Sequence, residues 1–132
     1  MSFINLTSHS IQIFDKENFV NLVETKPGSL VADSVEGEPI LSVASSGEAR
    51  IAMKTELLPS MDGVQMFKTE YSDLIGIPEG ISEDDILIVS LATKSNTNAS
   101  GHPLAKQMVS PYRVVRLTSN TSQILGAIGL TY

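Results

Sequence analysis

Residues 86–91 read ILIVSL, and this run (Ile86–Leu91) decides the fold that we expect. It is almost uninterrupted in its apolar residues, with acidic residues 83–85 before it and polar residues 93–95 after it. A short apolar run with polar flanks is typical of a strand whose two faces are both buried. The pattern therefore predicts the centre of a β-sheet at these residues.

The clearest turn signal precedes that run. The pair Asp62-Gly63 separates two β-like segments, Ala49–Leu57 and Val64–Tyr71. Asp-Gly favours a type I′ turn, because this turn needs positive φ at both central residues. We therefore expect an antiparallel hairpin around this pair.

Three further hairpins are predicted where short β-like segments flank turn residues. They are an opening hairpin (3–6 and 11–14), a second (30–32 and 39–43) and a closing one (114–117 and 124–130). Gly126 and Gly129 indicate a bulge or a close backbone approach in the last strand. Helical character is restricted to short segments, namely 93–101 as a loop or short helix, 104–109 as a helical turn, and 19–23 as a helical turn or a strand.

These elements predict one mainly β domain over residues 1–132. We expect a compact small barrel or sandwich of antiparallel hairpins with one or two short helices. A chain of 14.2 kDa should expose roughly 6,800 Å² when folded. Its 42% hydrophobic residues are enough for a core that needs no metal or disulfide.

Composition excludes several classes of function. The chain has no cysteine, which excludes disulfides, thiolate zinc sites and cysteine nucleophiles. Its net charge of −6 and its lack of a basic cluster argue against extended nucleic acid and anionic membranes as partners. A small anionic ligand held by one or two arginines stays open. We expect no metal and no cofactor, because the two histidines, His9 and His102, have no metal-ligand spacing and no phosphate-binding glycine motif occurs.

The first residues, 1–13, carry neither a charged start nor a ten-residue apolar stretch. We therefore expect no signal peptide and a cytoplasmic location, in the cell or in an infected host. His9 lies between two serines in the first predicted turn, where its imidazole could donate to a neighbouring carbonyl.

The three arginines are candidate anion ligands. Arg50 begins a predicted strand, whereas Arg113 and Arg116 bracket Val114-Val115. An arginine fork suits phosphate or carboxylate. At period two, however, Arg113 and Arg116 point to opposite faces unless a bulge intervenes.

A set of short motifs runs through the chain. They are Ile4-Asn5-Leu6-Thr7-Ser8-His9, Ser46-Gly47-Glu48-Ala49-Arg50, Thr69-Glu70-Tyr71, Gly76-Ile77-Pro78, Ile88-Val89-Ser90, Val109-Ser110-Pro111, Val115-Arg116 and Ile124-Leu125-Gly126. As a set they resemble a family of small uncharacterised phage and bacterial proteins with an (Ile/Phe)-Asn-Leu-Thr-Pro-His N-terminus. Ser8 replaces the proline of that family, 15–38 is extra sequence, and 94–106 diverges.

The resemblance implies a compact β-rich fold and a phage counter-defence role. In that role a non-catalytic protein binds a small immune signalling nucleotide and withholds it from its receptor. A pocket of this kind needs cations for phosphates, hydroxyls for ribose and a ring for the base. The matched polar residues assign Arg50 and Arg116 to phosphate, Tyr71 and His9 to the base, and Ser90 and Ser110 to hydroxyl groups. We also expect a homo-oligomer, because two small subunits can enclose a ligand that one exposes.

Two other classes of function stay open. A small nucleotide hydrolase would use His9 or His102 as general base. A phage structural or host-protein-binding module would instead use an exposed β edge or apolar patch, with Met53, Met61, Met66 and Phe67 as contributors.

Overall fold

The computed structural model describes residues 2–132, apart from the side chain of Ser72, and is mainly β. It has one α-helix, α1 (Leu91–Ala99), and two 3-10 helices, η1 (Lys16–Asn18) and η2 (Pro103–Gln107). The strands are β1 (Phe3–Asn5), β2 (Ile11–Ile13), β3 (Phe19–Val20), β4 (Val23–Lys26), β5 (Ser29–Ala32), β6 (Ser34–Val35), β7 (Leu41–Val43), β8 (Arg50–Met61), β9 (Val64–Ile75), β10 (Ile86–Ile88), β11 (Met108–Leu117) and β12 (Asn120–Thr131).

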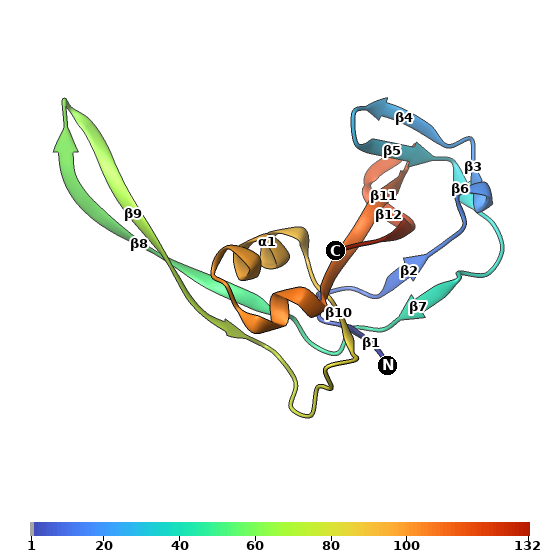
Figure 1. Ribbon diagram of the computed structural model, residues 1–132. Coiled ribbons are helices and arrows are strands. Elements are labelled where there is room, and N and C mark those ends of the chain that lie inside the picture. The colour runs from blue at the N-terminus through green and yellow to red at the C-terminus, as the bar shows by residue number, and fades with distance from the viewer. Residues whose placement is uncertain (1) are drawn as a thin grey trace.

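Eight strands form one sheet that curls into a nearly closed barrel (Figure 1). Its order is β1-β10-β11-β12-β2-β7, and β5 pairs with β11 on one side and with β4 on the other. Helix α1 packs against β11, η2 and the start of β8. The expected fold class, a mainly β small barrel or sandwich with short helices, is confirmed.

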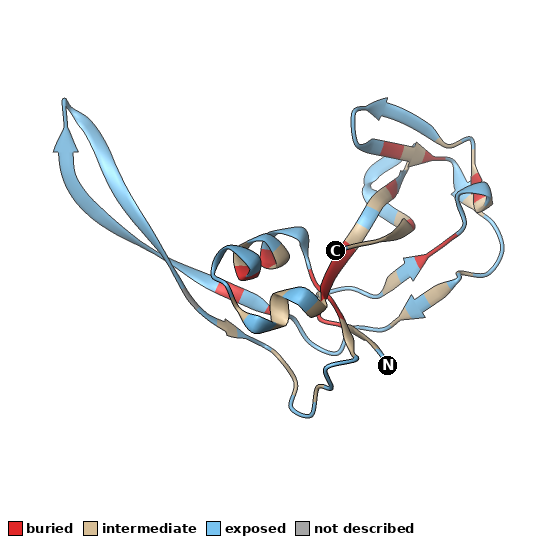
Figure 2. Cartoon of the chain, in the orientation of Figure 1, coloured by how far each residue is buried: buried red, intermediate tan, exposed pale blue. Residues whose placement is uncertain are grey.

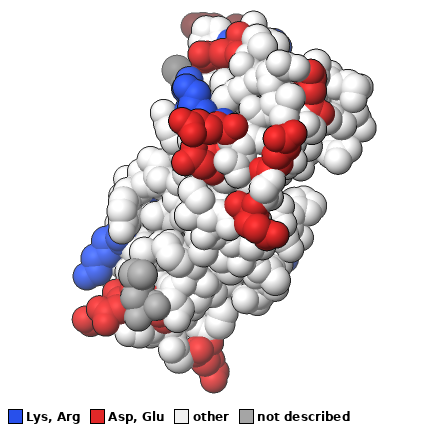
Figure 3. All heavy atoms as spheres, turned by 90° about the vertical axis from the view of Figure 1, so that its right-hand side faces the viewer, with Lys and Arg blue, Asp and Glu red and all other residues white. Residues whose placement is uncertain are grey.

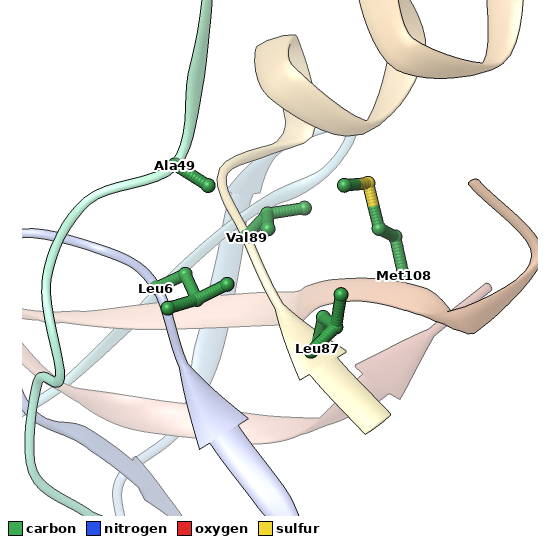
Figure 4. Close-up of a cluster of buried hydrophobic side chains, with 5 residues drawn as sticks. All are labelled: Leu6, Ala49, Leu87, Val89 and Met108. Atoms are coloured by element: carbon green, nitrogen blue, oxygen red, sulfur yellow. The ribbon is translucent and has the colours of Figure 1, made fainter. Parts of the chain in front are cut away.

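The first half of the apolar run at 86–91 is an interior strand, as predicted, but the strand ends at Ile88 and Leu91 already begins α1. Strand β10 lies between β1 and β11, and both of these neighbours run parallel to it. Leu87, Ile88 and Val89 are fully buried. Leu87 and Val89 belong to a cluster with Leu6, Ala49 and Met108, whose side chains converge in Figure 4.

A second core cluster lies under β5 and β11. Phe14 and Phe19 meet edge to face with their ring centroids 5.8 Å apart, and Leu30 and Val115 are buried in the same cluster. Residues 15–38 thus add apolar side chains to the core rather than looping out of it. The segment 19–23, left open between helix and strand, contains β3 and the first residue of β4.

Two of the predicted hairpins are wrong. Strand β1 pairs with β10 instead of β2, and β2 pairs with β7 and β12. Likewise β5 pairs with β4 and β11 instead of β7. Polar turn residues determine where the chain changes direction. The pairing of a three-residue strand, however, depends on which distant segments can bury its side chains. The closing hairpin, β11–β12, forms as predicted, with register shifts on both sides of Arg116.

Asn5 joins the two ends of the sheet. Its backbone bridges to Ser45, just after β7, and its side-chain amide donates to the Val43 carbonyl at 2.9 Å. The same amide donates to the His9 carbonyl, and its oxygen accepts from the backbone N–H of Thr7. Through Asn5, the Asn-Leu-Thr motif therefore holds β1 against the end of β7, and we call this junction between the two ends of the sheet the barrel seam. The motif engages His9 through its carbonyl, whereas the His9 imidazole is exposed.

Strands β8 and β9 form a separate two-stranded sheet that extends far from the barrel (Figure 1), and we call it the arm. The Asp62-Gly63 turn lies at its tip with φ of 50° and 80°, as the type I′ prediction requires. Nearly every residue of the arm is exposed (Figure 2). The whole chain exposes 8513 Å², about 1,700 Å² more than a compact domain of this mass would.

Candidate functional site

Two cavities and the arm are the candidate sites of this molecule. One cavity, of about 810 Å³, lies between the β4–β5 hairpin and β11, and we call it the basic cavity. Lys26, Arg113 and Arg116 line it together with Tyr112. Three of the nine lysines and arginines of a net-negative chain thus gather around one hollow. By contrast, the face drawn in Figure 3 carries several separate groups of acidic side chains and fewer cations.

Irregular backbone brings Arg113 and Arg116 to the same cavity. Arg113 has a φ of 54°, and the β11–β12 register shifts between Val115 and Arg116. The side chains between the two arginines therefore do not alternate strictly between the two faces of the strand. This irregularity is the bulge without which Arg113 and Arg116 would point to opposite faces. A left-handed, non-glycine residue inside a strand carries strain of about 1–3 kcal/mol, which the surrounding structure must offset.

Both guanidinium groups already have protein partners. Arg113 donates to Glu24 at 3.2 Å, and its guanidinium carbon lies 6.0 Å from the centroid of the Tyr112 ring. Arg116 donates to the Thr121 carbonyl at 3.1 Å. Each contact uses few of the five N–H donors of a guanidinium, so both arginines keep donors for a ligand.

The second cavity, of about 790 Å³, is mainly apolar and lies between residues 6–12, the start of α1 and β12. It contains His9 and Ser90. The Ser90 hydroxyl oxygen accepts from the Thr93 backbone N–H at 3.2 Å and donates to the Thr93 hydroxyl, so Ser90 is the N-cap of α1. This cavity offers a ligand an imidazole and an apolar wall.

The six residues assigned to a nucleotide do not meet in one site. His9 and Ser90 share the apolar cavity, and Arg116 lies in the basic cavity. Arg50 and Tyr71 lie on the arm and line neither. Ser110 is buried in β11, and its hydroxyl has no hydrogen-bond partner within the described chain.

The second histidine has a structural role. His102 is the N-cap of η2, and its Nδ1 accepts from the Leu104 backbone N–H at 3.1 Å. Within residues 2–132, no three potential metal ligands are grouped together. None of the helices in this part of the chain has the length and apolar character of a membrane-spanning helix.

The arm has two chemically different faces, because directly paired residues of an antiparallel hairpin point to the same side. One face, the charged arm face, carries the opposed pairs Lys54–Glu70 and Glu56–Lys68, followed toward the tip by the apolar pair Leu58–Met66. The other, the apolar arm face, carries three successive cross-strand pairs without charge: Met53–Tyr71, Thr55–Thr69 and Leu57–Phe67.

The large side chains of the apolar arm face are exposed in the single chain. Met53 is 63% exposed, Leu57 62%, Phe67 57% and Tyr71 47%. The sequence names Met53, Met61, Met66 and Phe67 as an apolar patch, but not Leu57. Of these, Met53 and Phe67 lie on the apolar arm face, whereas Met66 pairs with Leu58 next to the charged pairs and Met61 pairs with Val64 beside the turn. Counting back from the Asp-Gly turn without a bulge places Leu57 opposite Lys68. A register shift between Leu58 and Met61 instead places Leu57 opposite Phe67, and this hid the pattern.

No protein-family model, no curated protein sequence and no solved structure matches this chain significantly. The resemblance to small phage and bacterial proteins therefore stays a prediction.

Proposed function

We propose that this chain is an assembly protein that binds another polypeptide through the apolar arm face. The observation that carries the proposal is the exposure of Met53, Leu57, Phe67 and Tyr71 on one side of an unsupported hairpin. A two-stranded hairpin is marginally stable in water, and contiguous exposed apolar side chains mark interaction sites. A partner that covers this face stabilises the arm and removes its apolar surface from water.

The charged arm face supports the same proposal. Lys68 Nζ lies 3.1 Å from Glu70 Oε1 on this face, and both side chains are more than half exposed. Opposite charges alternate on this face, as on a surface that faces water. The arm is thus charged on one face and uncharged on the other, which is the pattern of a sheet with one face toward water and the other covered. This module corresponds to the phage structural or host-protein-binding class.

Site-specific photo-crosslinking tests this proposal. A benzoylphenylalanine in place of Phe67 should give a covalent adduct with a polypeptide, in the purified chain or in an extract of its native cells. The same probe in place of Lys68, its neighbour on the opposite face, is the control and should give far less. Absence of any polypeptide adduct at position 67, or equal yields at both positions, would rule the function out.

A second candidate function is the binding of a small anionic ligand, with sequestration of a signalling nucleotide in phage counter-defence as its biological form. The basic cavity favours it, since Lys26, Arg113 and Arg116 offer cations and Tyr112 offers a ring. In this version Arg116 keeps its assigned phosphate role, and Lys26 and Arg113 take the place of Arg50. His9 and Ser90 would contact a ligand only in the other cavity.

Native mass spectrometry of protein from cells with an active nucleotide-signalling defence tests the second candidate. An intact nucleotide released in stoichiometric amount would support sequestration, and Arg116→Gln should then reduce occupancy at least tenfold. Lys54→Gln removes the same charge from the arm and should not reduce it. A ligand-free mass in several such systems would refute this function, and a released hydrolysis product would favour the hydrolase.

A further inference from the structure

We infer that the partner of the apolar arm face is the same face of a second copy, related by a two-fold axis. This inference rests on the proposed function and names its partner. The reason lies in the order of side chains along the arm: a large pair (Met53–Tyr71), a small pair (Thr55–Thr69) and a large pair (Leu57–Phe67). The order is the same in both directions.

A two-fold axis through the Thr55–Thr69 pair places the three pairs of one copy against the three pairs of the other in reverse order. With the two arms antiparallel, Met53 of one copy faces Leu57 of the other, Tyr71 faces Phe67, and each threonine faces its own equivalent. A two-fold interface requires such self-complementarity, because one patch must fit itself. Large apolar side chains then meet large apolar side chains, with two aromatic pairs in the interface.

No charge is buried in this arrangement. Lys54, Glu56, Lys68 and Glu70 all lie on the opposite face and stay in water on the outside of a four-stranded, two-layer sandwich. A buried ion without a partner would cost several kcal/mol, so the separation of charge from the apolar row matters for the choice of partner. Antiparallel arms also carry the two barrels to opposite ends of the interface, where they do not collide.

The four large side chains of the apolar arm face supply about half of the area that a specific dimer needs, and neighbouring residues of the arm must supply the rest. A specific interface needs roughly 800 Å² from each partner. The chain exposes about 1,700 Å² more than a compact domain of its mass, and the arm is the part that extends from the barrel (Figure 2). Four large side chains about half exposed supply roughly 400 Å² of this per copy, and the threonines and flanking residues add to it.

The test compares the full-length chain with two arm variants by sedimentation equilibrium. The unaltered chain should sediment at twice 14.2 kDa. Leu57→Glu, which places a charge in the interface, should weaken the dimer roughly hundredfold. Lys54→Gln on the charged arm face is the control and should leave the dimer intact, because it places no like charge opposite Glu70. Both positions are exposed in the single chain, so the fold of the monomer should survive both changes.

Crosslinking checks the axis independently of the charge variant. The chain has no cysteine, so Thr55→Cys introduces one thiol, which a bismaleimide of roughly 10 Å should join to its equivalent in the second copy across stacked sheets. Glu56→Cys, on the other face, should not crosslink. A monomer at every concentration, or a dimer that survives Leu57→Glu, overturns the inference. If Phe67 then crosslinks to a different polypeptide, the proposed function stands without it.

Discussion

Gly76 lies against the backbone of Glu48, and this contact closes the base of the arm. A Cβ on Gly76 would overlap the Glu48 carbonyl oxygen and lie 2.9 Å from its carbonyl carbon. Glu48 lies two residues before the start of β8 at Arg50, and Gly76 directly follows the end of β9 at Ile75. The two strands of the arm therefore leave the barrel through a backbone contact that only glycine permits.

Gly76→Ala should destabilise the chain by about 3 kcal/mol or prevent folding. The alanine must overlap a carbonyl and also hold a φ of 85°. Gly80→Ala is a matched control, because Gly80 has a φ of 79° but no neighbour within 4 Å. It should cost about 1 kcal/mol. Urea denaturation followed by circular dichroism measures both, and equal losses would refute the role of the contact.

Gly126 and Gly129 should respond differently to alanine, although both have the same interpretation at the level of sequence, a bulge or a close backbone approach. A Cβ on Gly126 would lie 2.8 Å from the Phe14 ring and 3.1 Å from the Gln12 carbonyl oxygen. The ring is buried against Phe19 and cannot move freely. We expect Gly126→Ala to lower the free energy of unfolding by about 1–3 kcal/mol. Gly129→Ala meets nothing within 4 Å and should change it by less than about 1 kcal/mol.

Local sequence patterns predicted part of this fold, but they did not predict which distant strands pair with one another. The turn at Asp62-Gly63 and the buried strand at 86–88 are decided by backbone preference and by composition, so both were predicted correctly, whereas the predicted strand extended three residues too far. The partners of β1 and β5 depend on segments about 80 residues away, which no local pattern encodes. The fold class survived this error, because any arrangement of such short strands around one core gives a small barrel or sandwich.

The same limit applies to the candidate sites. The sequence identifies Arg113 and Arg116 as candidate anion ligands, but neither Lys26 nor Tyr112 stands out in it. These residues meet because β5 pairs with β11, and because irregular backbone turns Arg113 toward the cavity that Arg116 lines. Arg50 and Tyr71 were grouped with Arg116 by motif alone, and the arm carries both away from that cavity.

Core burial predicts a contrast between two leucines that are four residues apart. Leu87 is fully buried in the first cluster, whereas Leu91 at the start of α1 is 64% exposed. Leu87→Ala should lower the free energy of unfolding by about 2–5 kcal/mol through lost burial and the cavity left behind. Leu91→Ala should lower it by less than about 1 kcal/mol. Similar losses at both positions in guanidinium titrations would contradict the burial of β10.

Asp33 should show a hydrogen-bond-dependent pKa. The Asn21 side-chain amide donates to the Asp33 carboxylate at 2.8 Å, and this bond, followed by one with Thr118, lowers the pKa of Asp33. A lowered pKa in the folded state means that the stabilisation is present above pH 3.8 and is lost as pH falls through the lower folded value. Asn21→Ala should raise the Asp33 pKa in an NMR titration. Asn96→Ala, on α1, should leave it unchanged.

Asn5 should be the most sensitive polar residue of the barrel, because it is fully buried and its side chain bonds both to the turn at Thr7 and His9 and to Val43 of β7. Asn5→Ala removes the amide donor to the Val43 and His9 carbonyls and the acceptor of the Thr7 N–H, and only the His9 carbonyl keeps another side-chain donor, the Thr7 hydroxyl, so we expect a loss of about 3 kcal/mol in the free energy of unfolding. Asn5→Asp keeps the shape and the acceptor for Thr7 but turns an oxygen toward the two carbonyls. Its loss should therefore be as large at neutral pH and smaller in acid, where the protonated carboxyl can donate again. Asn120→Ala, which removes two exposed bonds from Ser122, is the control and should cost less than about 1 kcal/mol. A pH-independent loss for Asn5→Asp in thermal unfolding would mean that the amide is not the donor that closes the seam.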